Sequence, residues 1–391
     1  MDLSGARTPA FPDPQVRLWT RSFALVWALT FLTFFAAFQL FPTVPLRLRE
    51  LGASLGESGR FMSLFTAGSA TGALFTGSLG DRIGHRRMVV ACALLYAAFL
   101  AAYAMLTTRA GFYLLAFPHG VVWSGLLTAT MASLGAVLPE SRQTDGMSLY
   151  GLASPGGVVV GPVLGLWIQQ HWGFAPIGWY LAGLFVLLGI LGTSLPKDHP
   201  HAAPEPFRLP EASVFAPALV FFSVALGYGA LGSYTAQEGL ALGMPLPSAF
   251  LSCMALGMVL MRLAMAKRGF GQRPIRLLPA MLLGAFAGMA ILALMPGGML
   301  RHVLSALLYG AGYSMMHTLL NARLLETVDP KRRGAAFGAL LFSFDAGIGI
   351  GSFALGWAIG AYGYRAGWAL GALAVLASLP TARRLSLAAT A

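Results

Sequence analysis

Long apolar runs separated by short polar stretches dominate the hydrophobicity pattern of the chain. A helix that crosses a bilayer needs about 20 mostly apolar residues. By that criterion the pattern predicts an all-α polytopic membrane protein with twelve spanning helices. The first six are expected at Ser22–Leu46, Ser58–Leu79, Met88–Thr107, Gly111–Leu138, Gly146–Gln170 and Phe174–Leu195. The second six are expected at Val214–Ala236, Pro247–Ala266, Ile275–Met295, Met299–Leu325, Gly334–Ala361 and Gly363–Ala382.

One polar, Pro-rich stretch, from Pro196 to Glu211, interrupts this pattern between the sixth and seventh spans. It is the obvious linker, and it divides the chain into two similar halves. The predicted organisation is a tail over 1–21, a six-helix bundle over 22–195, a linker over 196–213, a second six-helix bundle over 214–382 and a tail over 383–391.

A shift of the sequence by 191 residues tests whether the halves are related. Under this shift Gly80-Asp81-Arg82 falls on Gly271-Gln272-Arg273, in the corresponding loop of the second half. Pro139 then falls on Pro330 in a second, separate loop. A single offset that serves two loops indicates an internal repeat. Two parallel six-helix halves with a substrate site between them are a known plan for transporters.

Composition agrees with the membrane prediction, because 57% of residues are hydrophobic and only 10% are charged. Soluble domains carry about 25% charged residues. In a soluble chain a net charge of +12 would suggest nucleic-acid binding. Here the positive residues instead follow the predicted membrane topology. Twenty of the 26 Lys and Arg residues fall on one side of the twelve spans, which makes that side cytoplasmic. Both termini are therefore expected in the cytoplasm, and no nucleic-acid partner is expected. The first span is too long for a cleaved signal peptide.

The sequence carries no motif of soluble enzyme chemistry. Cys92 and Cys253 lie far apart in apolar stretches, which excludes a disulfide framework and predicts buried structural thiols. There is no HExxH, no phosphate-binding loop and no GxSxG, so no cofactor or metal is expected. Any transport must be driven by an ion gradient or by the substrate's own gradient. A membrane-embedded enzyme remains an alternative of a different class, with His119, His317 and Asp345 as its only conceivable constellation.

The loop between the second and third spans reads Gly77-Ser78-Leu79-Gly80-Asp81-Arg82-Ile83-Gly84-His85-Arg86-Arg87. It resembles the signature G-x-x-x-D-R-x-G-R-R of the major facilitator superfamily, and departs from it only at His85. Together with the twelve spans, the linker and the paired halves, the resemblance covers nearly the whole chain. It implies a carrier that rocks its two halves around a central site.

The same resemblance implies a role for the residues of this loop, Gly77, Asp81, Arg82, Gly84, Arg86 and Arg87. In the family, the aspartate is thought to clasp the halves together on the cytoplasmic side. Gly77 and Gly84 permit close helix approach and a tight turn. For Arg86 and Arg87, contact with lipid head groups is an equal alternative to a charge network. Gln272 replaces the aspartate in the second half, so the clasp should be asymmetric.

The fifth span contains Gly157, Gly161, Pro162 and Gly165. This run resembles the Gly-Pro motif in helix five of the family's antiporters, which is associated with export. Pro162 removes a backbone hydrogen bond, and the glycines leave a smooth face at four-residue spacing. We expect that face to pack against the opposite half and to bend during switching, with an ordinary packing seam as the alternative.

Asp345 is the most informative polar residue within a span. It lies near the middle of the eleventh span, where an ionised carboxylate is costly and usually faces a cavity. We therefore hypothesise that Asp345 couples transport to protons or binds a cation; the alternative is a structural carboxylate that pairs with a neighbouring helix. Weaker candidates for the substrate cavity are Gln39, His119, Trp123, His317 and Asn321. A hydrogen-bonded structural role is the alternative for both histidines, and Arg262 is expected to extend to the membrane surface.

The expected function is secondary active transport across the bacterial inner membrane. The leading hypothesis is proton-coupled efflux of an amphipathic drug-like compound or metabolite, as an antiporter. The alternative is proton-coupled uptake of a nutrient or metal chelate. The expected partners are the small-molecule substrate, protons and membrane lipids, and a monomer suffices for this mechanism.

Overall fold

The computed structural model describes residues 18–139, 142–196, 211–268, 274–329 and 332–387, and all regular structure within them is helical. The first group of helices is α1 (Arg21–Glu50), α2 (Leu55–Ser58), α3 (Arg60–Ala73), α4 (Thr76–Ile83), α5 (His85–Met105), α6 (Arg109–Val137), α7 (Gln143–Tyr150), α8 (Ala153–Trp172) and α9 (Ala175–Gly192). The second group is η2 (Ala212–Val214), α10 (Phe215–Ala241), α11 (Ala249–Arg268), η3 (Pro274–Leu277), α12 (Leu278–Leu294), α13 (Met299–Ser314), α14 (Met316–Thr327), α15 (Arg333–Tyr362), α16 (Tyr364–Ala377) and α17 (Leu379–Leu387). The predicted linker falls almost wholly in 197–210, outside the described residues.

Eight helical stretches of the described chain are long and apolar enough to cross a membrane. They correspond to the first, third, fourth, sixth, seventh, ninth, tenth and eleventh predicted spans. The second, fifth and twelfth predicted spans are divided into shorter helices, and the eighth corresponds to α11, whose apolar part is Ala249–Met265. Large apolar side chains such as Leu114, Ile190 and Leu373 are exposed along these helices. Such a surface is expected where the surrounding solvent is hydrocarbon.

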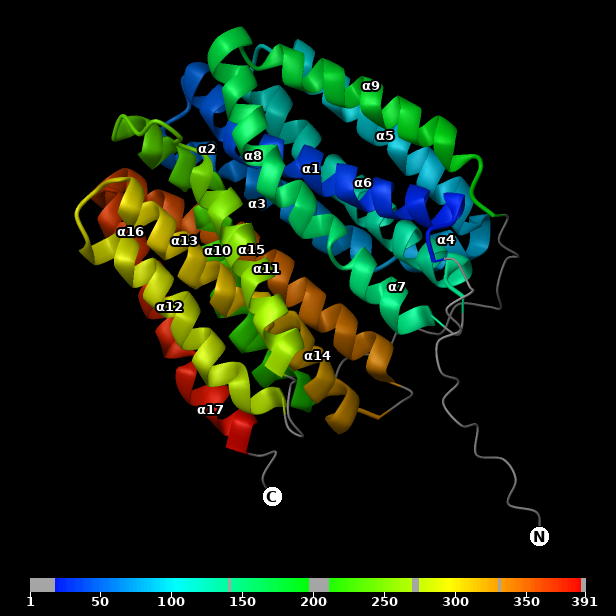
Figure 1. The fold of residues 1–391 in the computed structure, drawn as a ribbon. Coiled ribbons are helices and arrows are strands. Elements are labelled where there is room, and N and C mark those ends of the chain that lie inside the picture. Colours follow the sequence, from blue (N-terminus) through cyan, green and yellow to red (C-terminus); the bar gives the residue numbers. More distant parts are fainter. Residues whose placement is uncertain (1–17, 140–141, 197–210, 269–273, 330–331, 388–391) are drawn as a thin grey trace.

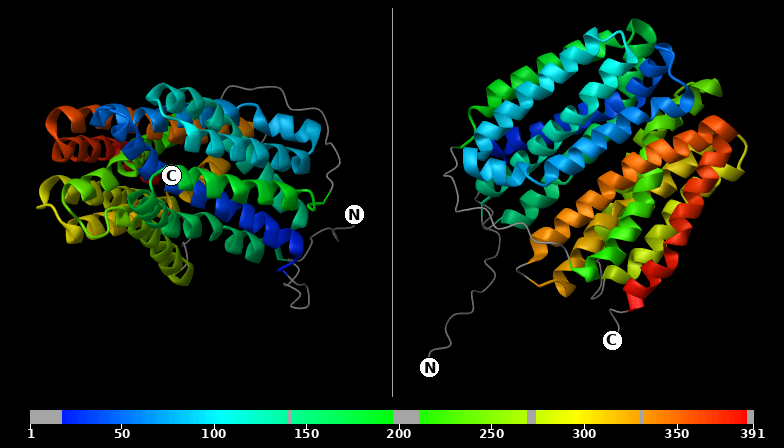
Figure 2. Two further views of the ribbon diagram at one scale, coloured as in Figure 1. Left: turned by 90° about the horizontal axis from the view of Figure 1, so that it is seen from above. Right: turned by 180° about the vertical axis from the view of Figure 1, so that it is seen from behind.

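The helices form two bundles, α1–α9 and α10–α17, as Figures 1 and 2 show. We call the end with α4, α7, α14 and α17 the terminal face, because α1 begins there and α17 ends there (Figure 1). The opposite end, with α2, is the distal face. The bundles lie together at the distal face and diverge toward the terminal face (Figure 1).

The two bundles repeat one another in their turns. Gly173 ends α8 with φ +82°, and Gly363 ends α15 with φ +84°. A positive φ favours glycine because that residue has no Cβ. Arg142 and Arg332 are the N-caps of α7 and α15. The structure thus confirms the repeat. Corresponding residues at these turns are 190 apart, whereas Gly52 and Gly243, which both have positive φ, keep the predicted offset of 191.

Glycines at helix crossings follow the same symmetry. Gly68 of α3 and Gly120 of α6 each lie directly against a backbone carbonyl of the other helix, which leaves no room for a Cβ. Gly257 of α11 and Gly310 of α13 make the equivalent crossing in the second bundle. In lipid, helices associate by such close packing of small residues rather than by a hydrophobic driving force. These crossings fix the geometry of each bundle.

Candidate functional site

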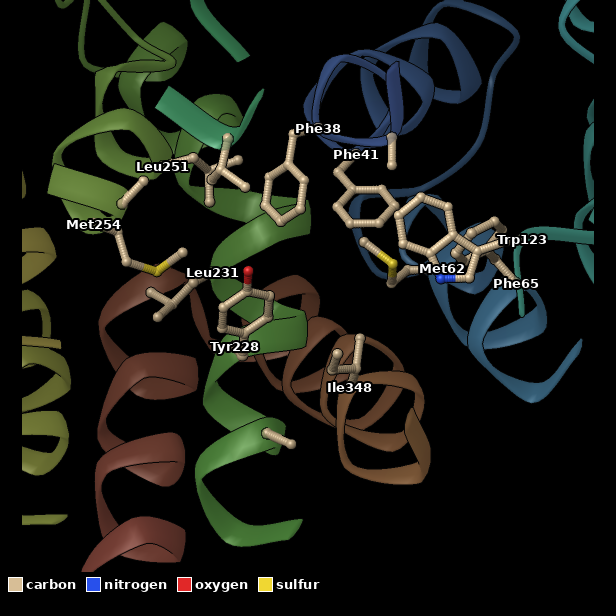
Figure 3. Packing of buried hydrophobic residues seen from close by; sticks show 14 of the residues in the cluster. Phe38, Phe41, Met62, Phe65, Trp123, Tyr228, Leu231, Leu251, Met254 and Ile348 are labelled. Carbon is tan, nitrogen blue, oxygen red and sulfur yellow. The ribbon is translucent and has the colours of Figure 1, made fainter. Parts of the chain in front are cut away.

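The two bundles meet along a seam formed by α1, α3 and α8 on one side and α10, α11 and α15 on the other. Figure 3 shows the apolar middle of this seam, where Phe38 and Phe41 of α1 approach Tyr228 of α10. The rings of Phe38 and Tyr228 are edge to face at 6.4 Å. Edge-to-face aromatic pairs are favourable without covalent or ionic linkage. The middle of the seam is therefore held by contacts that can be broken and remade.

Hydrogen bonds between the bundles close the distal end of the seam. The Tyr234 hydroxyl lies 3.3 Å from the carbonyl of Gly56, and Gln237 Nε2 donates to Ser58 Oγ at 3.1 Å. The Ser352 hydroxyl donates to the carbonyl of Gly59 at 3.0 Å. We call these six residues the distal seal. Gly59 lies against both Tyr234 and Ser352, so a side chain there would force the bundles apart.

Asp345 lies on the seam face of α15, half-buried, in the middle of a 30-residue helix. Its carboxylate lies near Ser69 of α3, which belongs to the other bundle. Nearly two turns from Ser69 on α3, Ser63 Oγ donates to the carbonyl of Gly349 at 2.7 Å. The structure thus places the Asp345 carboxylate at the seam between the two bundles.

Three polar side chains of the second bundle lie on the terminal side of Asp345. His317 and Asn321 are one turn apart on α14, and the amide nitrogen of Asn321 is 3.1 Å from the imidazole. Arg262 of α11 is exposed, and its charge acts on both His317 and Tyr313. The charge of Asp345 also acts on Tyr313. Of the predicted site residues, the structure therefore pairs His317 with Asn321, and the exposed Arg262 lies near His317.

An aromatic wall surrounds this polar group on the second bundle. Phe221 and Phe344 stack at 4.8 Å, and the Tyr228 and Tyr313 rings are 5.0 Å apart. The Phe221 ring is 5.8 Å from His317. A few polar groups set into an apolar, aromatic surface are typical of sites for amphipathic small molecules.

The other three cavity candidates lie inside the first bundle, apart from this group. His119 is 1% exposed, its Nδ1 is 3.3 Å from the Tyr103 hydroxyl, and aromatic rings surround it. Trp123 packs against Phe65 in the same aromatic cluster. Gln39 is fully buried where α1 meets α8 and accepts a hydrogen bond from Tyr180. The enzyme constellation of His119, His317 and Asp345 is therefore not assembled.

The signature loop forms the turn between α4 and α5. Gly84 has φ +91°, which explains the glycine at that position. Asp81 is 3.3 Å from His85 Nε2, within its own bundle, and Arg86 donates to the carbonyl of Thr193 at 3.3 Å. Arg82 lies in the last turn of α4, Arg87 in the first turn of α5, and Gly77 faces Thr128 of α6. A contact between Asp81 and the second bundle remains a prediction. We expect it in an arrangement in which the two bundles meet at the terminal face.

The glycine face of α8 packs differently from our expectation. Gly157, Gly161 and Gly165 lie against the backbone of α1, around Phe35 and Gln39, within the same bundle. The prediction of packing against the opposite half was wrong, because a different face of α8 meets the second bundle. There, Ser252 of α11 donates to the carbonyl of Val159 at 2.6 Å. Pro162 is buried in the middle of α8, where it leaves one carbonyl without its helical partner.

A buried charged cluster was missed at the sequence level. Glu238 is 3% exposed inside the second bundle. Its carboxylate accepts from Arg301 at 2.5 Å and from Trp368 Nε1 at 3.0 Å, and His302 Nε2 lies 3.5 Å away. The adjacent Arg301-His302 pair in an apolar segment was the available signal. No cluster of three or more metal-ligating side chains occurs among the residues described.

Comparison with known proteins assigns this architecture to a class. The profile of the Major Facilitator Superfamily matches residues 26–352. Multidrug resistance protein MdtG of Serratia proteamaculans is 24% identical over 185 residues, which are 46% of this chain and 45% of that protein. Multidrug resistance protein MdtL of Klebsiella pneumoniae is 24% identical over 168 residues, 43% of each chain. The chain thus matches about half the length of these curated relatives.

Solved structures show the same fold over nearly the whole chain. The human organic anion transporter MFSD10 superposes with a TM-score of 0.71 at 15% identity, covering 93% of this chain and 99% of that one. The nucleoside transporter NupG gives 0.71 at 16% identity, covering 94% and 99%. The fold and the seam define a polytopic secondary transporter. The chain belongs to the major facilitator superfamily, as its signature loop indicated, and the predicted all-α fold with two pseudo-symmetric bundles is confirmed.

Proposed function

We propose that this protein exports small amphipathic compounds from the bacterial cytoplasm in exchange for protons. The observation that carries the proposal is the position of Asp345, which lies at the seam near Ser69 of the other bundle. An ionised carboxylate in a low-dielectric region needs a partner, and protonation removes that need. Because the partner belongs to the other bundle, occupancy by a proton and separation of the bundles are energetically linked.

The polar and aromatic group around Asp345 supports an amphipathic substrate. Phe221, Tyr228 and Phe344 offer apolar surface, and His317 and Asn321 offer hydrogen bonds. The positive-inside distribution places the terminal face in the cytoplasm. In that orientation the bundles are closed at the distal, external side, and the site is poised to take substrate from inside.

Export rather than uptake is supported by two features. The α8 run with Gly161 and Pro162 resembles that of the family's antiporters, and the relatives MdtG and MdtL are named multidrug resistance proteins. Neither feature identifies the compound. A growth panel of toxic compounds in an efflux-deficient bacterial host would supply a transported probe.

Purified protein in liposomes with an imposed pH gradient then tests the mechanism with that probe. Wild type should accumulate the compound in the acidic compartment. Asp345→Asn should lose gradient-driven accumulation by about tenfold or more, as expected when the coupling group is absent, yet still exchange compound down its own gradient. Glu326→Gln, which removes an exposed carboxylate on α14, is the matched control and should behave as wild type. Gradient-driven accumulation that survives in Asp345→Asn would refute this role of Asp345, and sensitisation of the host by wild type would indicate uptake.

A further inference from the structure

A hollow of about 670 Å³ lies at the outer edge of the seam, between α8 and the stretch Pro245–Ser248. We call it the α8 groove. Its α8 wall runs from Val159 to His171, twelve residues or about 18 Å along the helix axis. Cavities of about 300–1,000 Å³ are the usual size of small-molecule sites. The groove is separate from Asp345 and has no role in the mechanism above.

Both walls of the α8 groove are fixed by packing. On α8, Val160, Val163, Trp167 and His171 recur at three- and four-residue spacing and so form one stripe. The opposite wall is held because Pro247 packs directly against Gly239 of α10. One wall belongs to each bundle, and the groove is continuous with the seam at Val159, whose carbonyl binds Ser252.

Polarity changes along the groove in one direction. Its deep part is formed by valines and leucines. Its distal end carries Gln170 and His171, next to the exposed Trp172. Tryptophan is enriched where the hydrocarbon meets the head groups. The described residues that line the groove include no Lys, Arg, Asp or Glu, so none of them compensates a net charge on an occupant.

We propose that the α8 groove binds one acyl chain of a zwitterionic phospholipid from the distal leaflet, with the ester and head-group region beside Gln170 and His171. Val160 and Trp167 are about half exposed at a depth where the surroundings are hydrocarbon, so lipid tails reach the groove without crossing a polar barrier. A filled groove gains dispersion contacts with both walls that an empty one lacks. Because each wall belongs to a different bundle, the bound chain favours the distally closed arrangement.

The test measures lipid retention, so its outcome does not depend on which compound is transported or in which direction. Full-length protein is delipidated in detergent, incubated with palmitoyl-oleoyl phosphatidylethanolamine, and examined by native mass spectrometry. Val163→Trp fills the groove, and Val186→Trp, on an exposed part of α9 outside the groove, is the matched control. Wild type and Val186→Trp should retain one lipid, and Val163→Trp should retain about tenfold less, a difference of about 1.4 kcal/mol.

A phosphatidylethanolamine with a photoreactive group at the end of its acyl chain locates the bound lipid. Cross-links should map to the middle of α8 and to Pro245–Ser248. Circular dichroism on heating establishes that Val163→Trp is folded. Cross-links that map elsewhere in the wild-type protein would overturn the proposal, whatever the variants do. Equal retention by all three proteins would also overturn it. Displacement of the lipid by a transported compound at stoichiometric concentration would assign the groove to substrate instead.

Discussion

Single charged residues in this protein are held by partners on neighbouring helices. Glu238 contacts Arg301 of α13 and Trp368 of α16, so one carboxylate connects three helices of the second bundle. Arg301 also donates to the carbonyl of Leu292 at 3.0 Å, which adds α12. Removing one member of a buried ion pair leaves the other charge uncompensated, whereas removing both can be nearly neutral.

We therefore expect Arg301→Met to destabilise the protein by about 3–5 kcal/mol. The double variant Arg301→Met with Glu238→Gln should recover a substantial part of this loss, because no buried charge then remains unpaired. Reversible unfolding in mixed micelles measures the difference, with Arg323→Met at an exposed pair as the control. A double variant as unstable as the single one would show that packing, rather than charge, holds these helices together.

Glu57 offers a pH-dependent contact at the distal face. It forms a capping box with Ser54, and the Ser54 backbone N–H is 2.8 Å from its carboxylate. This hydrogen bond lowers the pKa of Glu57, and Arg60 and Arg109 lower it further. A lowered pKa means that the contribution to stability is present above the ordinary glutamate range and is lost as pH falls through the lowered value.

Amide hydrogen exchange at Leu55–Gly59, corrected for intrinsic rates, should consequently be constant from neutral pH down to the ordinary glutamate range. It should rise only in more acidic solution. Glu57→Gln should remove this step and show the faster exchange at all pH values. Protection that changes near neutral pH in wild type would contradict the assignment to Glu57.

At the scale of elements, the sequence predicted the apolar spans and their repeat because twenty apolar residues leave few alternatives in a membrane. It also located Asp345, since a carboxylate in the middle of a span is conspicuous. It could not tell which way a side chain points. The glycine face of α8, for example, was assigned to the wrong neighbour. An all-apolar helix has no polar face to orient it, so its rotation is set by tertiary packing alone.

The helix crossings give a prediction at this scale. Gly310→Ala places a methyl group against the carbonyl of Met254, where backbone leaves no space. Overpacking of this kind costs about 1–3 kcal/mol. Gly135→Ala, on α6, has open space around the new methyl group and should be neutral or slightly stabilising. Thermal unfolding in detergent compares the two, and equal stability would mean that the α11–α13 crossing relaxes at no cost.

For the whole molecule, the structure shows one arrangement of two bundles, closed at the distal face. Its hydrogen bonds there, such as Gln237 to Ser58, are few and uncharged. A net contribution of about 0.5–1.5 kcal/mol is typical for each bond of this kind. A seal of that strength is compatible with reversible opening.

A disulfide across the distal seal should therefore stop transport. With Cys92 and Cys253 replaced by serine, Ser58→Cys with Gln237→Cys should lose transport on oxidation and regain it on reduction. Ser223→Cys with Ser378→Cys, which joins two helices inside the second bundle, should remain active when oxidised. The transported probe is the compound from the growth panel, and loss of activity in both oxidised pairs would argue against rigid-body rocking.

The distribution of interior charge between the bundles has an electrical consequence. Glu238 and Arg301 are paired within one bundle, so they move together and carry no net charge through the membrane field when the bundles rock. One elementary charge crossing 100 mV corresponds to about 2.3 kcal/mol. In the proposed mechanism Asp345 changes its charge when it binds or loses a proton, so the membrane potential would act on the cycle through the protonation state of this carboxylate. Voltage and the pH gradient would then drive the same step of the cycle.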